Sequence, residues 1–240
     1  MNLHDLFRNV SDGERLFQEL VSPEWCTQAS LKRLQRKFLN PRRPFLLIRH
    51  FLKLFIAEFW YEELQSSPHR VQLDYFKMRK WPTPWKAHYQ GKIEGHWDLV
   101  QEKHFIVGQL VQALFLSDYF SRFLSGIVGT SHSLTYLGGH HQQMGAGDWI
   151  NPHDDALGTR EITAVYYAAK EWKKAYGGYL FIGPWEAPRF HIAPRFNQLL
   201  VLRLERHMFH GVEPIRKNAG DRIRYSSIFW FCEKNHRVKI

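Results

Sequence analysis

The stretch Gly145-Ala-Gly-Asp-Trp-Ile-Asn-Pro-His-Asp-Asp155, followed by Glu161-Ile-Thr-Ala-Val-Tyr-Tyr167, decides the fold. Its first part is rich in turn-forming residues, and its second part is a β-branched and aromatic run typical of a buried strand. Further short runs of this kind lie at 134–137, 179–182, 198–204 and 225–231, with Gly, Pro or Asn between them. Several short strands at such spacing predict a β-sandwich or jelly roll.

The flanking segments have the apolar spacing of helices. Ser11 begins a Ser-x-x-Glu capping box, Ser30 is placed to cap a second helix, and Pro44 is placed to open a third, amphipathic one over residues 45–60. Residues 105–128 return to helical spacing, and Gly129 follows near the end. We therefore predict an α+β protein with a mainly β core and flanking N-terminal helices.

The predicted organisation has two parts. Residues 1–105 form a helical and loop-rich region that packs on the core and shapes the substrate site. Residues 106–240 form the core with its supporting helix. The segment 66–95, with Trp81-Pro-Thr-Pro-Trp85, is expected to be loop and short strand.

Composition narrows the class of protein. In 240 residues, 44 % are hydrophobic and 15 % aromatic, which supplies a packed core and argues against disorder. No run is long enough to span a membrane, and the N-terminus has no secretory pattern. Cys26 and Cys232 are too few for a disulfide framework, so we expect reduced thiols in a cytoplasmic protein. The oligomeric state cannot be read from these features.

The formal net charge of +10 is compatible with two kinds of anionic partner, a nucleic acid or an anionic substrate. A stretch from Lys32 to Lys53 contains eight basic residues and no acidic one, which would suit nucleic acid, but there is no zinc-finger spacing or RNA-recognition signature. We keep nucleic acid as a minor alternative. Arg203 and Arg206 lie on the approach to His210, so the preferred partner is an anionic small-molecule or peptidyl substrate.

The motif His-x-Asp occurs twice. His153 and Asp155 lie between a glycine-containing turn and a strong strand, and residues i and i+2 of a strand share a face. His96 and Asp98 lie in a Trp-rich stretch without a strand pattern, so we expect ordinary polar contacts there. The first pair is therefore the candidate metal site.

A third ligand follows the apolar strand that ends near residue 202. His210 is the best candidate and His207 the nearby rival. Two histidines and one carboxylate make the facial triad that proteins use for iron(II), with three coordination positions left open. On the last strand, Arg222 and Arg224 have the same parity, and a buried arginine there needs an anion.

These residues resemble a known family, the prolyl 4-hydroxylase-like branch of the 2-oxoglutarate/iron(II) oxygenases. Five ordered blocks carry the resemblance: the glycine-rich lead into His153, the block from Arg160 to Trp172, Gly177-Gly-Tyr-Leu180, His210-Gly-Val-Glu-Pro214, and Arg224-Tyr225 with Trp230. The resemblance covers residues 134–231 and implies a double-stranded β-helix of the cupin-like, jelly-roll type. Residues before about 105 match no pattern of this family.

The resemblance implies a role for each matching residue. His153, Asp155 and His210 are expected to bind iron(II) and to form the catalytic centre. Arg224, with Arg222 second, is expected to pair with the distal carboxylate of 2-oxoglutarate, helped by Tyr167. Gln143 is expected to line the same pocket.

The implied activity is hydroxylation of an unactivated C–H bond, with succinate and CO2 as coproducts and with ascorbate as a helpful additive. Related halogenases lack the carboxylate ligand, whereas Asp155 is present here. We favour a small-molecule substrate, such as an amino acid or a carboxylate-bearing metabolite. The alternatives are a peptidyl hydroxylase, a desaturase or cyclase, and a ligand-binding domain without turnover.

Overall fold

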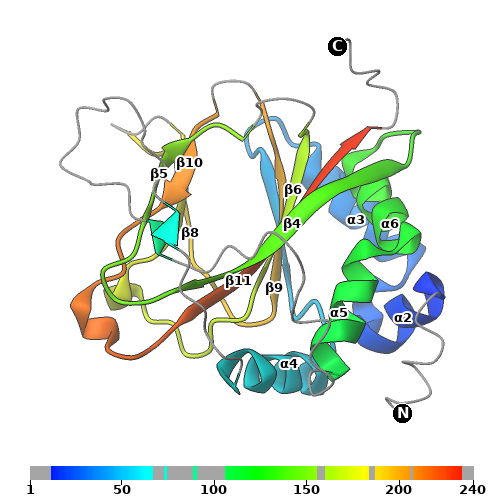
Figure 1. Ribbon diagram of the computed structural model, residues 1–240. Coiled ribbons are helices and arrows are strands. Elements are labelled where there is room, and N and C mark those ends of the chain that lie inside the picture. The colour runs from blue at the N-terminus through cyan, green and yellow to red at the C-terminus, as the bar shows by residue number, and fades with distance from the viewer. Residues whose placement is uncertain are drawn as a thin grey trace.

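The computed structural model describes residues 12–66, 73–74, 89–90, 106–155, 160–183, 187–205 and 208–233. Two antiparallel sheets lie face to face, and helices cover the outer face of the larger one (Figure 1). The five-stranded sheet has the order β1 (Phe45–Arg49), β9 (Gln198–Arg203), β6 (Ile162–Tyr167), β11 (Arg224–Glu233) and β4 (Leu134–Met144). The four-stranded sheet has the order β5 (Ile150–His153), β10 (His210–Val212), β7 (Leu180–Ile182) and β8 (Phe190–Ile192). This arrangement is the double-stranded β-helix that the sequence predicts.

Strand β6 shows how the sequence produces two layers. All six of its residues are buried, because the strand is covered on both faces. Ala164 and Tyr166 belong to the core beneath the helices, whereas Val165 and Tyr167 belong to the core between the sheets. The alternation of side chains therefore assigns Tyr167 to the interior of the β-helix.

The helices are α2 (Gly13–Leu20), α3 (Gln28–Phe38), α4 (Leu54–Ser66), α5 (Ile106–Leu116) and α6 (Asp118–Val128). Most of them lie against the outer face of the larger sheet, and α4 lies at its lower end in the view of Figure 1. Phe115 of α5 stacks on Phe229 of β11 with ring centroids 4.4 Å apart. The helices thus brace the strand that carries Arg224.

The predicted helix over residues 105–128 is two helices. Ser117 ends the first and caps the second, because its hydroxyl accepts a hydrogen bond from the backbone N–H of Phe120 at 3.1 Å. Gly129 ends α6 in the left-handed conformation with φ of 81°, as its position in the sequence suggests.

Both predicted N-caps are corrected by the structure. Asp12 caps α2 by accepting from the backbone N–H of Arg15, whereas Ser11 lies outside the described residues. Thr27 caps α3, and Ser30 donates its own backbone N–H to the Thr27 hydroxyl. The chain offers several Ser, Thr and Asp residues near each helix start, and the cap is the one that directly precedes the first residue with helical backbone angles.

The predicted helix over residues 45–60 is wrong in its first half. Phe45–Arg49 is β1, paired antiparallel with β9 at the edge of the larger sheet, and the helix α4 begins only at Leu54. Phe-Leu-Leu-Ile has no periodicity of its own, and pairing with β9 decides its conformation. A strand from the first 105 residues therefore belongs to the core sheet, while the two-part division of the chain stays a prediction.

Several smaller features complete the description. The short strands β5, β8 and β10 were not expected from the sequence, and a two-stranded sheet joins β2 (Leu73–Asp74) to β3 (Tyr89–Gln90). Short 3₁₀ helices occur at Pro23–Trp25, Lys174–Tyr176 and Lys217–Ala219. Cys26 and Cys232 are free thiols. Among the described residues, no helix has the length and apolarity that crossing a membrane requires.

Candidate metal centre

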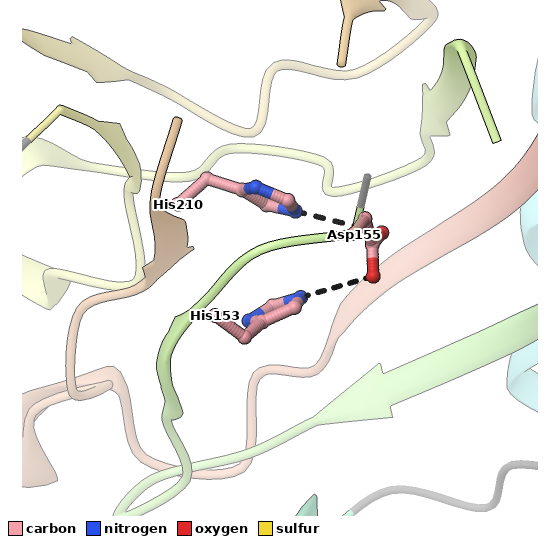
Figure 2. A group of neighbouring side chains, drawn as sticks. All are labelled: His153, Asp155 and His210. Atoms are coloured by element: carbon pink, nitrogen blue, oxygen red, sulfur yellow. Dashed lines mark ion pairs between the residues drawn. The ribbon is translucent and has the colours of Figure 1, made fainter. Parts of the chain in front are cut away.

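Three predicted side chains meet at one end of the smaller sheet. His153 is the last residue of β5, His210 is the first residue of β10, and the two are direct partners in the antiparallel register. Asp155 follows β5 by two residues. Figure 2 shows its carboxylate between the two imidazole rings, facing both.

The spacing of the donor atoms suits one shared ion. His153 Nε2 lies 3.7 Å from Asp155 Oδ1, and His210 Nε2 lies 3.6 Å from Asp155 Oδ2. All three donor atoms lie within 4.8 Å of one another. Two donors that each bind one ion at about 2 Å lie at most about 4 Å apart, so the two shorter distances fit a metal without rearrangement of the strands.

The protonation states also suit a metal. Burial lowers the pKa of His153 to about 4, so its ring is neutral near pH 7. Its Nδ1 lies 2.9 Å from the carbonyl oxygen of Asn151, which can only accept, so Nδ1 carries the hydrogen and Nε2 presents its lone pair to the site. Burial alone would raise the pKa of Asp155, but the contacts with His210, His153 and Trp230 outweigh it and keep that carboxyl ionised.

Two further residues hold Asp155 from the outside. The indole N–H of Trp230 donates to Oδ2 at 3.0 Å, and the Arg160 guanidinium lies 3.4 Å from Oδ1. The guanidinium also stacks over the Trp230 ring, 3.9 Å from its centroid. The sequence pattern contained both residues but gave neither a role, because nothing in one chain shows that they converge on Asp155.

Arg224 lies deeper in the β-helix and is 1 % exposed. Neutral acceptors surround it: the Gly178 carbonyl at 3.0 Å, the Ser226 hydroxyl at 3.2 Å, Gln142 Oε1 at 3.4 Å and Met144 Sδ at 3.6 Å. Acceptors of this kind orient the planar guanidinium without neutralising its charge. They therefore fix the plane in which the guanidinium can meet a carboxylate.

Tyr167 lies beside this arginine. The Arg224 guanidinium carbon is 5.1 Å from the centre of the Tyr167 ring. The tyrosine hydroxyl is buried, and no hydrogen-bond partner is found for it among the described residues. Burial raises the pKa of Tyr167, and the Arg224 charge offsets part of that shift, so the hydroxyl keeps its proton and can donate it. A carboxylate placed between the two residues would satisfy this hydroxyl.

Two predicted pocket residues are placed differently. Arg222 is exposed and lies over the Tyr176 ring, with 5.3 Å from its guanidinium carbon to the ring centroid, so it does not share the position of Arg224. On β4 it is Gln142 that contacts Arg224, whereas Gln143 pairs with Tyr225 and points to the other face. The sequence pointed to Gln143 as the residue that lines the pocket on β4, whereas its neighbour Gln142 contacts Arg224.

Of the two basic residues predicted on the approach to His210, Arg203 lies elsewhere. The Arg203 guanidinium lies over the Phe38 ring of α3, 5.1 Å from its centroid, on the helix side of the larger sheet. Arg206, the rival ligand His207 and the second pair, His96 and Asp98, lie outside the described residues.

A family comparison agrees with this geometry. Residues 139–232 match the family model described as the 2OG-Fe(II) oxygenase superfamily. The matched segment contains the triad, Arg224 and Tyr167. No curated protein matches the chain.

Solved structures share the fold at low sequence identity. A prolyl hydroxylase from Trichoplax adhaerens, in complex with a hypoxia inducible factor peptide fragment, is 18 % identical with a TM-score of 0.60, covering 86 % of this chain and 94 % of its own. A 2OG-Fe(II) oxygenase family oxidoreductase from Burkholderia pseudomallei is 15 % identical, with a TM-score of 0.59 and coverage of 86 % and 92 %. The epimerase SnoN of nogalamycin biosynthesis is 14 % identical, with a TM-score of 0.58 and coverage of 86 % and 84 %.

Proposed function

We propose that the protein, whose residues 139–232 match the model of the 2OG-Fe(II) oxygenase superfamily, hydroxylates an unactivated C–H bond of a small molecule. One observation carries the proposal: His153, Asp155 and His210 present three donor atoms within 4.8 Å of one another. Structural zinc sites use four protein ligands, whereas three leave positions open for a cosubstrate and O2.

The protein's own residues would hold iron(II) in a defined orientation. His153 and His210 would each bind through Nε2, the atom that faces Asp155. Trp230 and Arg160 each contact an Asp155 oxygen, so the carboxylate keeps its position as a ligand. When bound, iron(II) and 2-oxoglutarate would supply the electrons that activate O2 for oxidation of an unactivated C–H bond.

Arg224 and Tyr167 would bind the distal carboxylate of 2-oxoglutarate. Both are fully buried, so this end of the cosubstrate would be shielded from water and the charge-assisted pair strengthened. Gln142 and Ser226 hold the guanidinium, and a hydrogen bond of 3.2 Å joins them to each other. The pocket is thus preorganised by residues that do not themselves need to contact the cosubstrate.

Two measurements test the proposal. The purified protein, incubated aerobically with iron(II), ascorbate and 2-oxoglutarate, should release succinate even without its substrate. Under anaerobic conditions, iron(II) and 2-oxoglutarate together should produce a weak visible charge-transfer band. Absence of both signals, with zinc as the metal in the site, would reject the oxygenase assignment.

The nature of the product separates the remaining alternatives. Hydroxylation adds one oxygen atom to the substrate, whereas desaturation or cyclisation removes two hydrogens, so mass spectrometry distinguishes them. Modification of a peptide panel without modification of amino acids or organic acids would identify a peptidyl hydroxylase instead. The cytoplasmic location stays a prediction.

A further inference from the structure

A basic surface lies on the opposite side of the molecule from the metal centre. It is formed by exposed residues of α3 and of the turn that follows this helix: Lys32, Arg33, Arg36, Lys37, Arg42 and Arg43. In Figure 1, α3 and the strands β5 and β10, which carry the two histidines, lie on opposite sides of the larger sheet. The sequence contains no acidic residue from Trp25 to Ala57, so these cations follow one another without an intervening anion.

Helix α3 turns one face to the core and the other to solvent. Leu34 and Phe38 are buried, and residues four positions apart share one face of a helix. Lys32 and Arg36 are also four positions apart, on the exposed face, and Arg33 lies beside them. The exposed face of α3 is therefore a row of cations as long as the helix, which is about 16 Å for its 11 residues.

Aromatic rings hold several arginines of this region in place. The guanidinium carbon lies over a ring in three cases: Arg33 over Trp25 at 5.4 Å from the ring centroid, Arg43 over Phe45 at 4.7 Å and Arg203 over Phe38 at 5.1 Å. Arg33 and Arg43 are exposed all the same, so an anion from outside can reach them. Because the ring restricts a long side chain, less conformational entropy is lost when the cation binds an anion.

A row of ordered cations matches the backbone of a nucleic acid. Each strand of a DNA duplex carries one phosphate per about 3.4 Å of helix axis, so a row of about 16 Å is as long as about four or five phosphates. Four of the six residues of the basic surface are arginines, and a planar guanidinium can bind a phosphate with two N–H donors. Contacts of this kind do not read the base sequence.

A membrane matches the basic surface less well. A helix that lies in a membrane interface inserts its apolar face among the lipids. The apolar face of α3 packs on the core instead, and the exposed large hydrophobic residue next to the cations is Leu39, at the end of the helix. A lipid surface would therefore be held by charge alone, without the apolar insertion that strengthens such binding.

We propose that the basic surface binds the phosphate backbone of a nucleic acid independently of base sequence. This inference goes beyond the proposed function and does not rest on it. Because the basic surface is separate from the metal centre, a bound nucleic acid leaves the triad accessible. Binding would thus localise the protein on RNA or DNA while the oxygenase site acts on its own substrate.

Fluorescence anisotropy tests the proposal without any metal ion. The probes are fluorescein-labelled RNA and DNA strands of about 20 nucleotides with the same mixed sequence, and the corresponding DNA duplex. The protein should bind them, and the logarithm of the association constant should fall linearly with the logarithm of the salt concentration between about 50 and 200 mM. The expected slope is about −4 for the duplex, and the tighter of the RNA and DNA complexes identifies the source of the backbone.

Substitutions locate the binding surface. Arg36→Gln combined with Lys37→Gln should weaken binding about tenfold or more and reduce the steepness of the salt dependence by about two. Arg195→Gln combined with Lys217→Gln removes the same charge from exposed positions outside the basic surface and should change binding less than about threefold. Arg43→Lys keeps the charge but loses the planar group over Phe45, so it should weaken binding by about two- to fivefold.

Three outcomes would overturn the inference. The first is no binding of any oligonucleotide at about 50 mM salt, where electrostatic binding is strong. The second is equal weakening by the two double substitutions, which would mean that net charge alone attracts the probe. The third is tighter binding to vesicles of phosphatidylcholine and phosphatidylserine than to every oligonucleotide, which would assign the basic surface to a membrane. Circular dichroism confirms that each variant is folded before it is compared.

Discussion

At the residue scale, Asp155 is the only anionic member of the triad. Asp155→Ala should abolish product formation and lower the iron content of the purified protein, because it removes the carboxylate ligand and leaves only two imidazoles. Asp98→Ala, in the rival His-x-Asp pair, should keep an iron stoichiometry near one and most of the activity. Iron content and product yield are measured side by side on folded protein. Loss of iron from Asp98→Ala alone would move the site to the other pair.

The two arginines of the last strand make a second matched comparison. Arg224→Lys should raise the 2-oxoglutarate concentration needed for half-maximal succinate release by about 10- to 100-fold, because an ammonium cannot grip a carboxylate with two parallel N–H bonds. Arg222→Lys, at an exposed position, should change it less than about twofold. A larger effect from Arg222 would transfer the role to that residue.

The sequence could not decide between these arginines, since both lie on one side of an extended chain. The difference arises from where β11 begins: Arg224 is its first residue, and Arg222 precedes it after a 3₁₀ turn at Lys217–Ala219. Gln142 was missed for a related reason. The alternation of side chains along a strand separates two faces, but it does not show which face points into the β-helix. The pairing of β4 with β11 determines that Gln142 is on the inner face.

At the scale of elements, Glu63 joins two helices of the layer that braces β11. Its carboxylate accepts hydrogen bonds from the backbone N–H groups of Val107 and Gly108, at 3.0 and 2.6 Å, at the start of α5. Glu63→Ala should lower the free energy of unfolding by about 1–2 kcal/mol, as loss of an N-cap does. Glu62→Ala, at an exposed neighbour, should change it by less than about 0.5 kcal/mol in a urea titration. Equal effects would deny the capping role.

Substitutions at two glycines test whether the loop before β7 positions Arg224. Gly177 and Gly220 have nearly the same backbone conformation, φ 68° and ψ −143° against φ 60° and ψ −133°, which is costly for other residues. A Cβ at Gly177 would meet the Pro214 carbonyl oxygen, whereas a Cβ at Gly220 meets nothing within 4 Å. Both changes to Ala should cost about 1–3 kcal/mol of backbone strain.

Only Gly177→Ala should also weaken 2-oxoglutarate binding, because the displaced loop carries the Gly178 carbonyl that holds Arg224. Thermal unfolding and the 2-oxoglutarate dependence of succinate release are measured for both variants. If Gly220→Ala impairs cosubstrate binding equally, strain alone explains the effect.

Strands with a continuous β-branched and aromatic run could be predicted from the sequence. Strands whose conformation depends on pairing with a neighbouring strand could not. Ile-Thr-Ala-Val-Tyr-Tyr is buried on both faces, and its composition matches that environment. Phe45–Arg49 was misread as helix because only its pairing with β9 makes it a strand. Three-residue strands such as His210–Val212 carry too few side chains for any periodicity.

At the scale of the whole molecule, the triad joins two segments that are far apart in the chain. His153 and Asp155 follow the turn after β4, and His210 begins β10 more than fifty residues later. Sequence order predicted the members of this set because each has a distinctive local context. The contacts of Trp230 and Arg160 with Asp155 depend on how the strands come together, so the sequence alone did not reveal them.

A ligand that bridges such segments should stabilise the folded state. Mn²⁺ replaces iron(II) without turnover, and a ligand present at one hundred times its dissociation constant adds about 2.7 kcal/mol to the free energy of unfolding. Mn²⁺ with 2-oxoglutarate should therefore raise the midpoint of thermal unfolding, and each should strengthen the effect of the other. His153→Ala should remove the increase. His191→Ala, on the same sheet but paired with Glu213 at the surface, should preserve it. An equal increase in both variants would mean that the cation binds elsewhere, since His153, unlike His191, faces Asp155 in the site.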